Sequence, residues 1–223
     1  MHCVLCAPNQ DAPTNQQIRD AKSGNVYASI LHASVGDPVS TVESMAQAIP
    51  AGPGPLRLVI HCADPSPTDD PARLLAGWSP DGWAKFDESL AQLDAWTSEH
   101  GAELLIRPSA SGMLSDAICT MSWASRSADL GCGLLLDPVG WLTGTMINDA
   151  EDHLTRIAEL CHGCEKASAL LIRSIITDQA GNPVQASLSE GSLDTKMVVD
   201  QLRPLIDSTD TLVVLDPADL ELL

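Results

Sequence analysis

Six short apolar runs in this chain each end in a residue that can bind a ligand or transfer a proton. The runs cover residues 27–32, 56–61, 102–107, 133–137, 169–173 and 211–216, and their last residues are His32, His61, Arg107, Asp137, Arg173 and Asp216. Imidazole can act as an acid or a base near neutral pH, and a guanidinium pairs with anionic groups. A carboxylate can accept a proton or pair with a cation. If the runs are neighbouring strands, these residues predict one shared site.

The runs have the length and the Val/Ile/Leu content of strands that are buried on both faces. Residues 2–6 form a possible seventh run. Near-continuous apolar strands are typical of parallel sheets, in which functional residues lie at the carboxyl ends of the strands. We therefore expect the six terminal residues to surround one opening.

Segments with helical periodicity lie between the runs. Apolar residues recur at steps of three and four from Trp83 to Thr97, with a capping residue near Ser79 and Gly101 beyond the end. Further helices are predicted over about 115–131, over about 149–161 and after Asp194, the last with a kink at Pro204. Alternation of strands and helices indicates βαβ units.

The predicted fold class is α/β, a TIM-type (β/α) barrel with room for fewer than eight βα units. No strand is followed by the glycine-rich phosphate loops GxGxxG or GxxxxGK[ST], which argues against an open nucleotide-binding sheet. No linker divides the chain, so residues 1–223 are predicted to form a single barrel domain.

The chain is strongly acidic, with 30 acidic and 12 basic residues and a net charge of −18. This charge disfavours binding to nucleic acid and to anionic membranes. No apolar segment has the length of a membrane span, and no secretory signal is recognised. Seven cysteines, an odd number, predict reduced thiols and a cytoplasmic protein. The expected partner is a small molecule; the oligomeric state is left open.

The second half of the chain resembles the xylose isomerase-like TIM barrels, the superfamily of sugar phosphate isomerases/epimerases and of endonuclease IV-type enzymes. Three sequence segments carry the resemblance: Leu58-Val-Ile-His61, Gly133-Leu-Leu-Leu-Asp-Pro-Val-Gly-Trp-Leu142 and Ser189-Glu-Gly-Ser-Leu-Asp194. A fourth is the helix before Gly101 together with the strand that follows it. The resemblance covers about residues 56–216. The first 50 residues leave room for about two of the three early strands that the family has.

Set against the family's pattern, this chain lacks several ligands of the divalent metal. Arg107 stands where the resemblance implies a glutamate, Trp141 where it implies a histidine, and Arg173 near a further histidine, while Asp216 replaces a glutamate. A guanidinium has no lone pair to give to a metal. We therefore predict a salt-bridged cluster and a lost metal site, with no cofactor, although Mn²⁺ or Mg²⁺ remains an alternative.

Three functions are consistent with these residues. In the first, the chain is a sugar phosphate isomerase/epimerase-like barrel that binds a small anionic ligand. His61 and Asp137 are then the catalytic candidates, and His32, Arg107, Arg173 and Asp216 bind the substrate. In the second, the charged cluster only closes the barrel mouth of a non-catalytic binding protein. In the third, His61, Asp137, Asp178 and Asp216 hold a metal ion for an isomerase or an endonuclease.

Two Cys-x-x-Cys pairs, Cys3/Cys6 and Cys161/Cys164, have the local spacing of a zinc site. The first pair lies in a predicted strand, where positions three apart face opposite sides, and the second lies at a helix exit. The two pairs are therefore not expected to hold one ion.

Overall fold

The computed structural model describes residues 2–5, 16–20, 26–31, 56–61, 78–110, 112–179, 181–208, 212–216 and 219. For residues up to 57 and for residue 61, the description covers the backbone alone.

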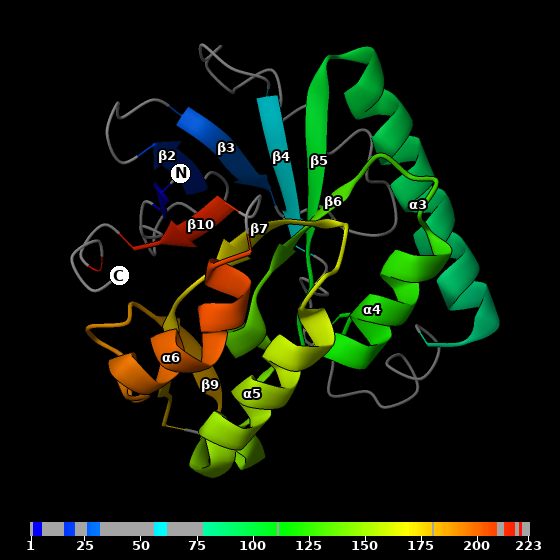
Figure 1. Ribbon diagram of the computed structural model, residues 1–223. Coiled ribbons are helices and arrows are strands. Elements are labelled where there is room, and N and C mark those ends of the chain that lie inside the picture. Colours follow the sequence, from blue (N-terminus) through cyan, green and yellow to red (C-terminus); the bar gives the residue numbers. More distant parts are fainter. Residues whose placement is uncertain are drawn as a thin grey trace.

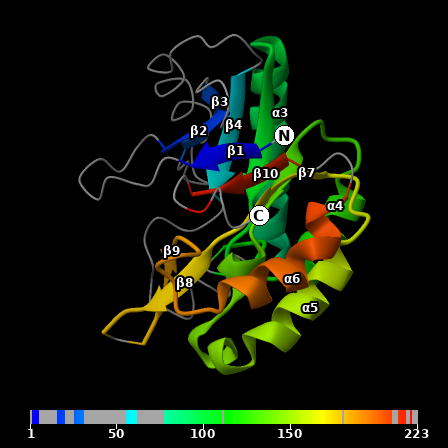
Figure 2. The same ribbon diagram turned by 60° about the vertical axis from the view of Figure 1, so that its left-hand side comes forward.

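Eight of the described strands form a ring in which each strand is hydrogen bonded to its two neighbours, so the barrel is closed. In ring order the strands are β1 (His2–Leu5), β10 (Leu212–Leu215), β7 (Ala167–Leu171), β6 (Gly133–Leu136), β5 (Ala102–Arg107), β4 (Leu56–His61), β3 (Val26–Leu31) and β2 (Gln16–Asp20). All neighbouring pairs are parallel except the two that β2 makes, with β1 and with β3. Figure 2 shows β1 and β10 side by side, so the first and the last described strands of the chain are neighbours in the ring.

The apolar strands bury both of their faces, in two separate layers. One layer fills the inside of the barrel, and the other lies between the barrel and its helices. The inner layer consists of Val59, Leu105, Leu135, Ala169, Leu171, Leu212 and Val214. The alternate residues, including Leu58, Leu104 and Leu134, belong to the larger outer cluster. Strict alternation between the layers follows from the period of two in a strand.

Four described helices cover the outside of the barrel, on the side of β5, β6, β7 and β10 (Figure 1). They are α3 (Pro80–Glu99), α4 (Ala117–Arg126), α5 (Ala150–Cys161) and α6 (Thr195–Ile206). The predicted face of α3 is buried, from Phe86 to Thr97, and Ser79 caps its start. Among the described residues, no helix is long and apolar enough to cross a membrane.

The structure corrects three details of the predicted elements. Helix α4 ends at Arg126 rather than near residue 131, and its buried face contains Trp123, while Ile118 is exposed. Strand β2 was not predicted, because its sequence, Gln-Gln-Ile-Arg-Asp, lacks an apolar run. It brings the early strands to three rather than about two.

The third correction is a hairpin after β7, formed by β8 (Ser174–Thr177) and β9 (Pro183–Ala186). Its turn is fixed by Asp178, whose carboxylate accepts a hydrogen bond from the backbone N–H of Asn182 at 2.8 Å, and by Gly181 at φ +87°. Positive φ costs glycine little. In the sequence, β8 directly follows the apolar run of β7 and is not recognisable as a separate element.

Candidate functional site

The strands that carry the six predicted residues are consecutive in the barrel, in the order β3, β4, β5, β6, β7 and β10. His61 is the last residue of β4 and pairs in register with Arg107, the last residue of β5. Asp137 follows β6 directly, Arg173 comes two residues after β7, and Asp216 follows β10. The chain therefore brings these positions to one rim of the barrel.

Strand alternation then directs three of the side chains toward the barrel axis. Leu105, Leu135 and Leu171 belong to the inner layer. Two residues further along the chain come Arg107, at the end of β5, and Asp137 and Arg173, just beyond β6 and β7. At this spacing their side chains face the same way as the inner-layer leucines. Their charged groups lie above the apolar inner layer.

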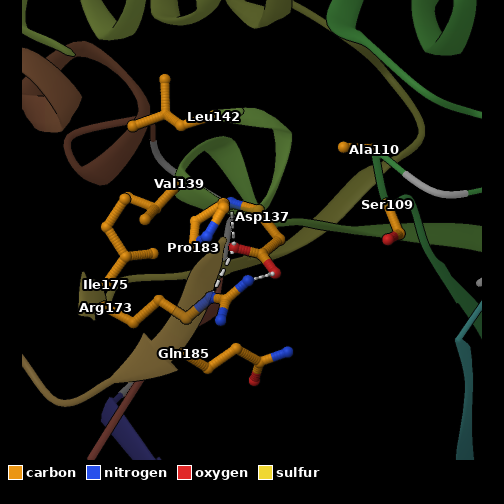
Figure 3. Close-up of a pocket in the computed structure, with 10 residues that line it drawn as sticks. Ser109, Ala110, Asp137, Val139, Leu142, Arg173, Ile175, Pro183 and Gln185 are labelled. Carbon is orange, nitrogen blue, oxygen red and sulfur yellow. Dashed lines mark hydrogen bonds and ion pairs between the residues drawn. The ribbon is translucent and has the colours of Figure 1, made fainter. Parts of the chain in front are cut away.

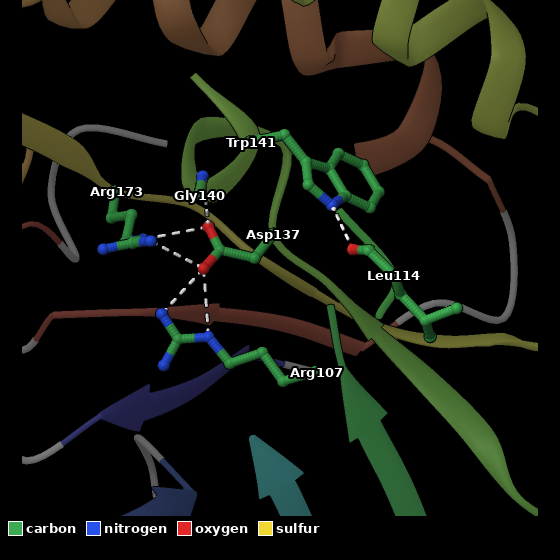
Figure 4. Close-up of polar contacts among 6 residues, drawn as sticks. All are labelled: Arg107, Leu114, Asp137, Gly140, Trp141 and Arg173. Atoms are coloured by element: carbon green, nitrogen blue, oxygen red, sulfur yellow. Dashed lines mark hydrogen bonds and ion pairs between the residues drawn. The ribbon is translucent and has the colours of Figure 1, made fainter. Parts of the chain in front are cut away.

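Asp137 lies between the two arginines and pairs with both (Figure 4). Arg173 binds it as a fork, with Nε 2.9 Å from Oδ1 and Nη2 2.7 Å from Oδ2. Arg107 donates from Nε and Nη2 to the same Oδ2, at 3.0 and 2.7 Å. The backbone N–H of Gly140 donates to Oδ1 at 3.0 Å. The five hydrogen bonds use both carboxylate oxygens from several sides.

All three charged residues of this cluster are buried. The exposed fraction is 2% for Arg107, 1% for Asp137 and 8% for Arg173. Burial would raise the pKa of Asp137, but the guanidinium groups of Arg173 and Arg107 reverse this effect and hold its pKa well below the usual range. Burial lowers the pKa of Arg107, and Asp137 opposes that change. Asp137 is therefore an ionised carboxylate at neutral pH.

The turn after β6 holds the carboxylate in place. Asp137 caps the short 3₁₀ helix η1 (Pro138–Trp141), which explains its bond to Gly140. A Cβ atom on Gly140 would lie 2.5 Å from Asp137 Oδ2 and 2.8 Å from Arg173 Nη2, so only glycine fits here. Trp141, at the position where the family resemblance implies a histidine, is buried instead, and its indole N–H donates to the carbonyl of Leu114 at 3.1 Å.

One nitrogen of the cluster, Nη1 of Arg173, is buried and has no hydrogen-bond partner among the described residues. A buried N–H donor without a partner is costly, and in native structures such a group usually has a ligand, ion or water nearby. In Figure 3 this nitrogen points away from Asp137, on the side where Gln185 lies. The cluster thus has one donor group available for a further molecule.

Beside the cluster is a pocket of about 330 Å³ (Figure 3). Its polar lining residues are Ser109, Asp137, Arg173 and Gln185, and its other walls are mostly apolar, among them Val139, Leu142, Ile175 and Pro183. Three of these residues belong to the β8–β9 hairpin, namely Ile175, Pro183 and Gln185. This volume is at the small end of the range for ligand pockets.

The structure thus brings three of the predicted site residues into contact and does not show the others in that cluster. Arg107, Asp137 and Arg173 come together, as the predicted salt-bridged cluster requires. His61 is placed by its backbone on the same rim, and His32 lies outside the described residues. Asp216 is half-buried at the end of β10. Asp178 lies in the exposed turn of the hairpin, away from the strand ends, so it is not part of the rim.

Gln185 is the pocket residue that sequence reasoning missed. It lies on β9, opposite Ile175 of β8 in the hairpin register. The signal in the sequence is weak: the turn residues Gly181-Asn182-Pro183 separate two short segments of strand-forming residues. Nothing in the sequence directs this hairpin to the barrel mouth.

The cluster does not fit a divalent metal ion. Both oxygens of Asp137 already accept hydrogen bonds from cationic groups, and neither arginine can donate a lone pair. Two guanidiniums beside a metal would also repel it. Among the described residues, no three His, Cys, Asp or Glu side chains lie together in a group that could hold a metal.

No protein-family profile matches the sequence, and no curated protein is significantly similar to it. Among solved structures, the fold is similar to that of 3-keto-D-glucoside 4-epimerase from E. coli, solved in its apo form. The TM-score is 0.54 at 20% identity, over 85% of this chain and 70% of that chain.

A xylose isomerase-like TIM barrel protein from Mycobacterium smegmatis, solved in complex with magnesium, also aligns. Its TM-score is 0.46 at 12% identity, over 79% of this chain and 59% of that one, so this chain spans about three fifths of its length. The likeness to the epimerase structure agrees with the α/β barrel fold that the sequence predicts.

Proposed function

We propose that this chain binds a small anionic, sugar-type molecule at the mouth of its barrel and acts as an isomerase or epimerase without a bound metal ion. The observation that carries the proposal is the buried Nη1 of Arg173, which has no partner among the described residues and belongs to a residue that lines a pocket at the strand ends. The fold shared with a sugar epimerase is consistent with it.

Each residue of the cluster has a separate role in this proposal. Arg173 contacts the anionic group of the ligand. Asp137 fixes the plane of the Arg173 guanidinium through its forked pair, and Arg107 holds Asp137 from the other side. Fixing the guanidinium in advance lowers the entropy that ligand binding would otherwise cost.

Proton transfer is assigned to His61 rather than to Asp137. Asp137 has a depressed pKa, and five hydrogen bonds occupy its oxygens, so it is a weak base. A histidine titrates near neutral pH, and His61 lies next to Arg107 on the rim. In an isomerase or epimerase it would remove a proton from a carbon adjacent to a carbonyl and later return one to the ligand.

The binding part is tested by calorimetric titration of the protein with a panel of anionic and neutral hexoses. We expect anionic sugars to bind and neutral sugars to bind at least tenfold more weakly. Arg173→Gln should lose the binding of anions. The control Arg203→Gln removes an exposed arginine of α6 and should leave binding unchanged. Equal binding by both variants would refute the role of Arg173.

The catalytic part is tested by proton NMR of the bound sugar in D₂O. Isomerisation or epimerisation through proton transfer introduces deuterium at the reacting carbon, even when the products are not identified. We expect incorporation with the wild-type protein and its loss with His61→Gln at unchanged sugar affinity.

A second function, a non-catalytic binding protein, is favoured by one observation: the cluster itself contains no group free to move a proton. If the protein binds anionic sugars but no deuterium enters them, the non-catalytic function is the correct one. The metal-dependent alternative is tested by thermal unfolding with Mn²⁺, Mg²⁺ or Zn²⁺, and a stabilisation that depends on Asp137 would support it against our proposal.

A further inference from the structure

We infer that the anionic group accepted by this pocket is a singly charged carboxylate, as in a sugar acid, rather than a phosphate. This inference rests on the proposed function and specifies its ligand. It follows from the charge of the buried cluster and from the number of donors that the pocket offers.

The charge of the cluster is the first argument. Two buried guanidiniums surround one ionised carboxylate, and Asp137 is the only acidic residue paired with them in the described part of the chain. Within the described residues, one positive charge of the cluster therefore has no paired anion. A bound carboxylate would neutralise it. A sugar phosphate, which carries nearly two negative charges at pH 7, would leave a buried negative excess. Buried charge that is not paired is strongly unfavourable.

The donors of the pocket are the second argument. Arg173 is the only basic residue among the described residues that line the pocket, and its Nε and Nη2 are already bonded to Asp137. A phosphate site usually supplies several backbone N–H groups or more than one basic side chain. Here the described lining offers one guanidinium together with two neutral side chains that can donate, Ser109 and Gln185. A single positive charge matches the single charge of a carboxylate better than the nearly double charge of a phosphate.

Gln185 supplies the second hydrogen bond in this arrangement. It lines the same pocket from strand β9, and Figure 3 shows its amide beside the Arg173 guanidinium. An amide N–H donates without adding charge, so Arg173 Nη1 and Gln185 can each bind one oxygen of a carboxylate. Gln185 is therefore assigned as a specificity-determining residue on the hairpin.

The experiment uses three pyranoses that differ at C6 alone: glucose, glucuronate and glucose 6-phosphate, together with the matching galactose series. Their charges at pH 7.5 are none, one and about two. Calorimetric titration of the full chain should show that the uronate binds at least tenfold more tightly than either the neutral sugar or the phosphate of the same series.

Two variants connect this preference to the pocket. Gln185→Glu places a second negative charge at the mouth and should weaken uronate binding at least tenfold. Gln185→Leu removes one hydrogen bond and should weaken it by about fivefold. Gln185 is at an exposed position of the hairpin strand β9, so neither substitution disturbs the packing of the core. Gln92→Glu, at an exposed position of helix α3, is the control and should leave the affinity unchanged.

The outcomes separate the two proposals. Tighter binding of the phosphate than of the uronate in both series would overturn the carboxylate assignment while leaving an anion site in place. If both Gln185 variants bind the uronate as tightly as the wild type does, the role of Gln185 is overturned. Failure of every anionic sugar to bind would overturn the proposed function itself.

Discussion

Gly140 shows how closely the carboxylate cluster is packed at the level of single residues. Gly140→Ala places a Cβ atom 2.5 Å from Oδ2 and 2.7 Å from Cγ of Asp137, inside a buried ion pair that cannot relax into solvent. We expect a loss of about 1–3 kcal/mol in the free energy of unfolding, measured by urea denaturation.

Gly131→Ala is the matched control for this change. A Cβ atom there would lie 3.1 Å from Oδ1 of Asp94, at the end of a side chain that is not fully buried. Because that side chain can shift, the loss should be below 1 kcal/mol. Equal losses for the two variants would contradict the tight packing of the Asp137 cluster.

Asp137 gives the stability a defined pH dependence. Its pKa is lowered by folding, so its contribution is complete above the unfolded value of about 4 and declines as the pH falls below that value. Asp137→Asn leaves two buried guanidiniums unpaired and should cost about 3–5 kcal/mol at pH 7. The difference from the wild type should shrink at pH 3.

Asp152→Asn provides the comparison in the same urea experiments. Asp152 pairs with Arg156 on the surface of α5, and such exposed pairs contribute less than about 1 kcal/mol. A constant difference between wild type and Asp137→Asn from pH 7 to pH 3 would show that the depressed pKa does not govern stability.

The sequence predicts the cluster residues but not the donor that points to a ligand. Arg107, Asp137 and Arg173 were recognisable because each ends a strong apolar run, and runs of this kind become neighbouring parallel strands. Nη1 of Arg173 has no partner among the described residues because Nε and Nη2 are the two nitrogens that bond to Asp137. That geometry follows from side-chain packing and has no sequence signature.

At the scale of elements, helix caps can be compared directly within this chain. Asp194 caps α6 by accepting a hydrogen bond from the Met197 N–H at 2.7 Å, whereas Asp149 at the start of α5 makes no such bond. Asp194→Ala should therefore lower the free energy of unfolding by about 1 kcal/mol, and Asp149→Ala should lower it by clearly less.

Chemical denaturation of the two alanine variants measures this difference. Both residues are aspartates at helix N-termini, so the general attraction of the helix dipole is shared. What remains is the capping bond itself. Equal losses would show that the Asp194 bond contributes nothing of its own.

Helices and strands could be predicted where burial of one or both faces gives the sequence a regular spacing of apolar residues. Elements without such a spacing could not be predicted. Helix α3 and strands β4 to β7 follow their apolar patterns, because each buries a face in one of the two core layers. The polar strand β2 has no such pattern, and backbone pairing with β1 and β3 alone identifies it. The hairpin is short and partly exposed, which likewise weakens any periodic signal.

At the scale of the whole molecule, the net charge of −18 sets the response to salt. Mutual repulsion of like charges destabilises a compact state, and salt screens it. Raising NaCl from 10 to 150 mM should therefore stabilise the protein by an amount on the order of 1 kcal/mol, seen as about 2–4 °C in Tm.

Sodium sulfate at the same ionic strength is a useful second condition, because sulfate also favours burial of apolar surface. Both salts should raise the Tm. A lower Tm at the higher NaCl concentration would mean that attractive ion pairs outweigh the repulsion between like charges.

The order in which the strands are made has a consequence for biosynthesis. Strand β10 lies between β1 and β7 in the ring, yet it is the last described strand to leave the ribosome. Until residues 212–215 emerge, the edges of β1 and β7 have no partner, and open edges promote association between chains. Ribosome-bound chains arrested before residue 212 should therefore recruit chaperones, and release of β10 should end that dependence.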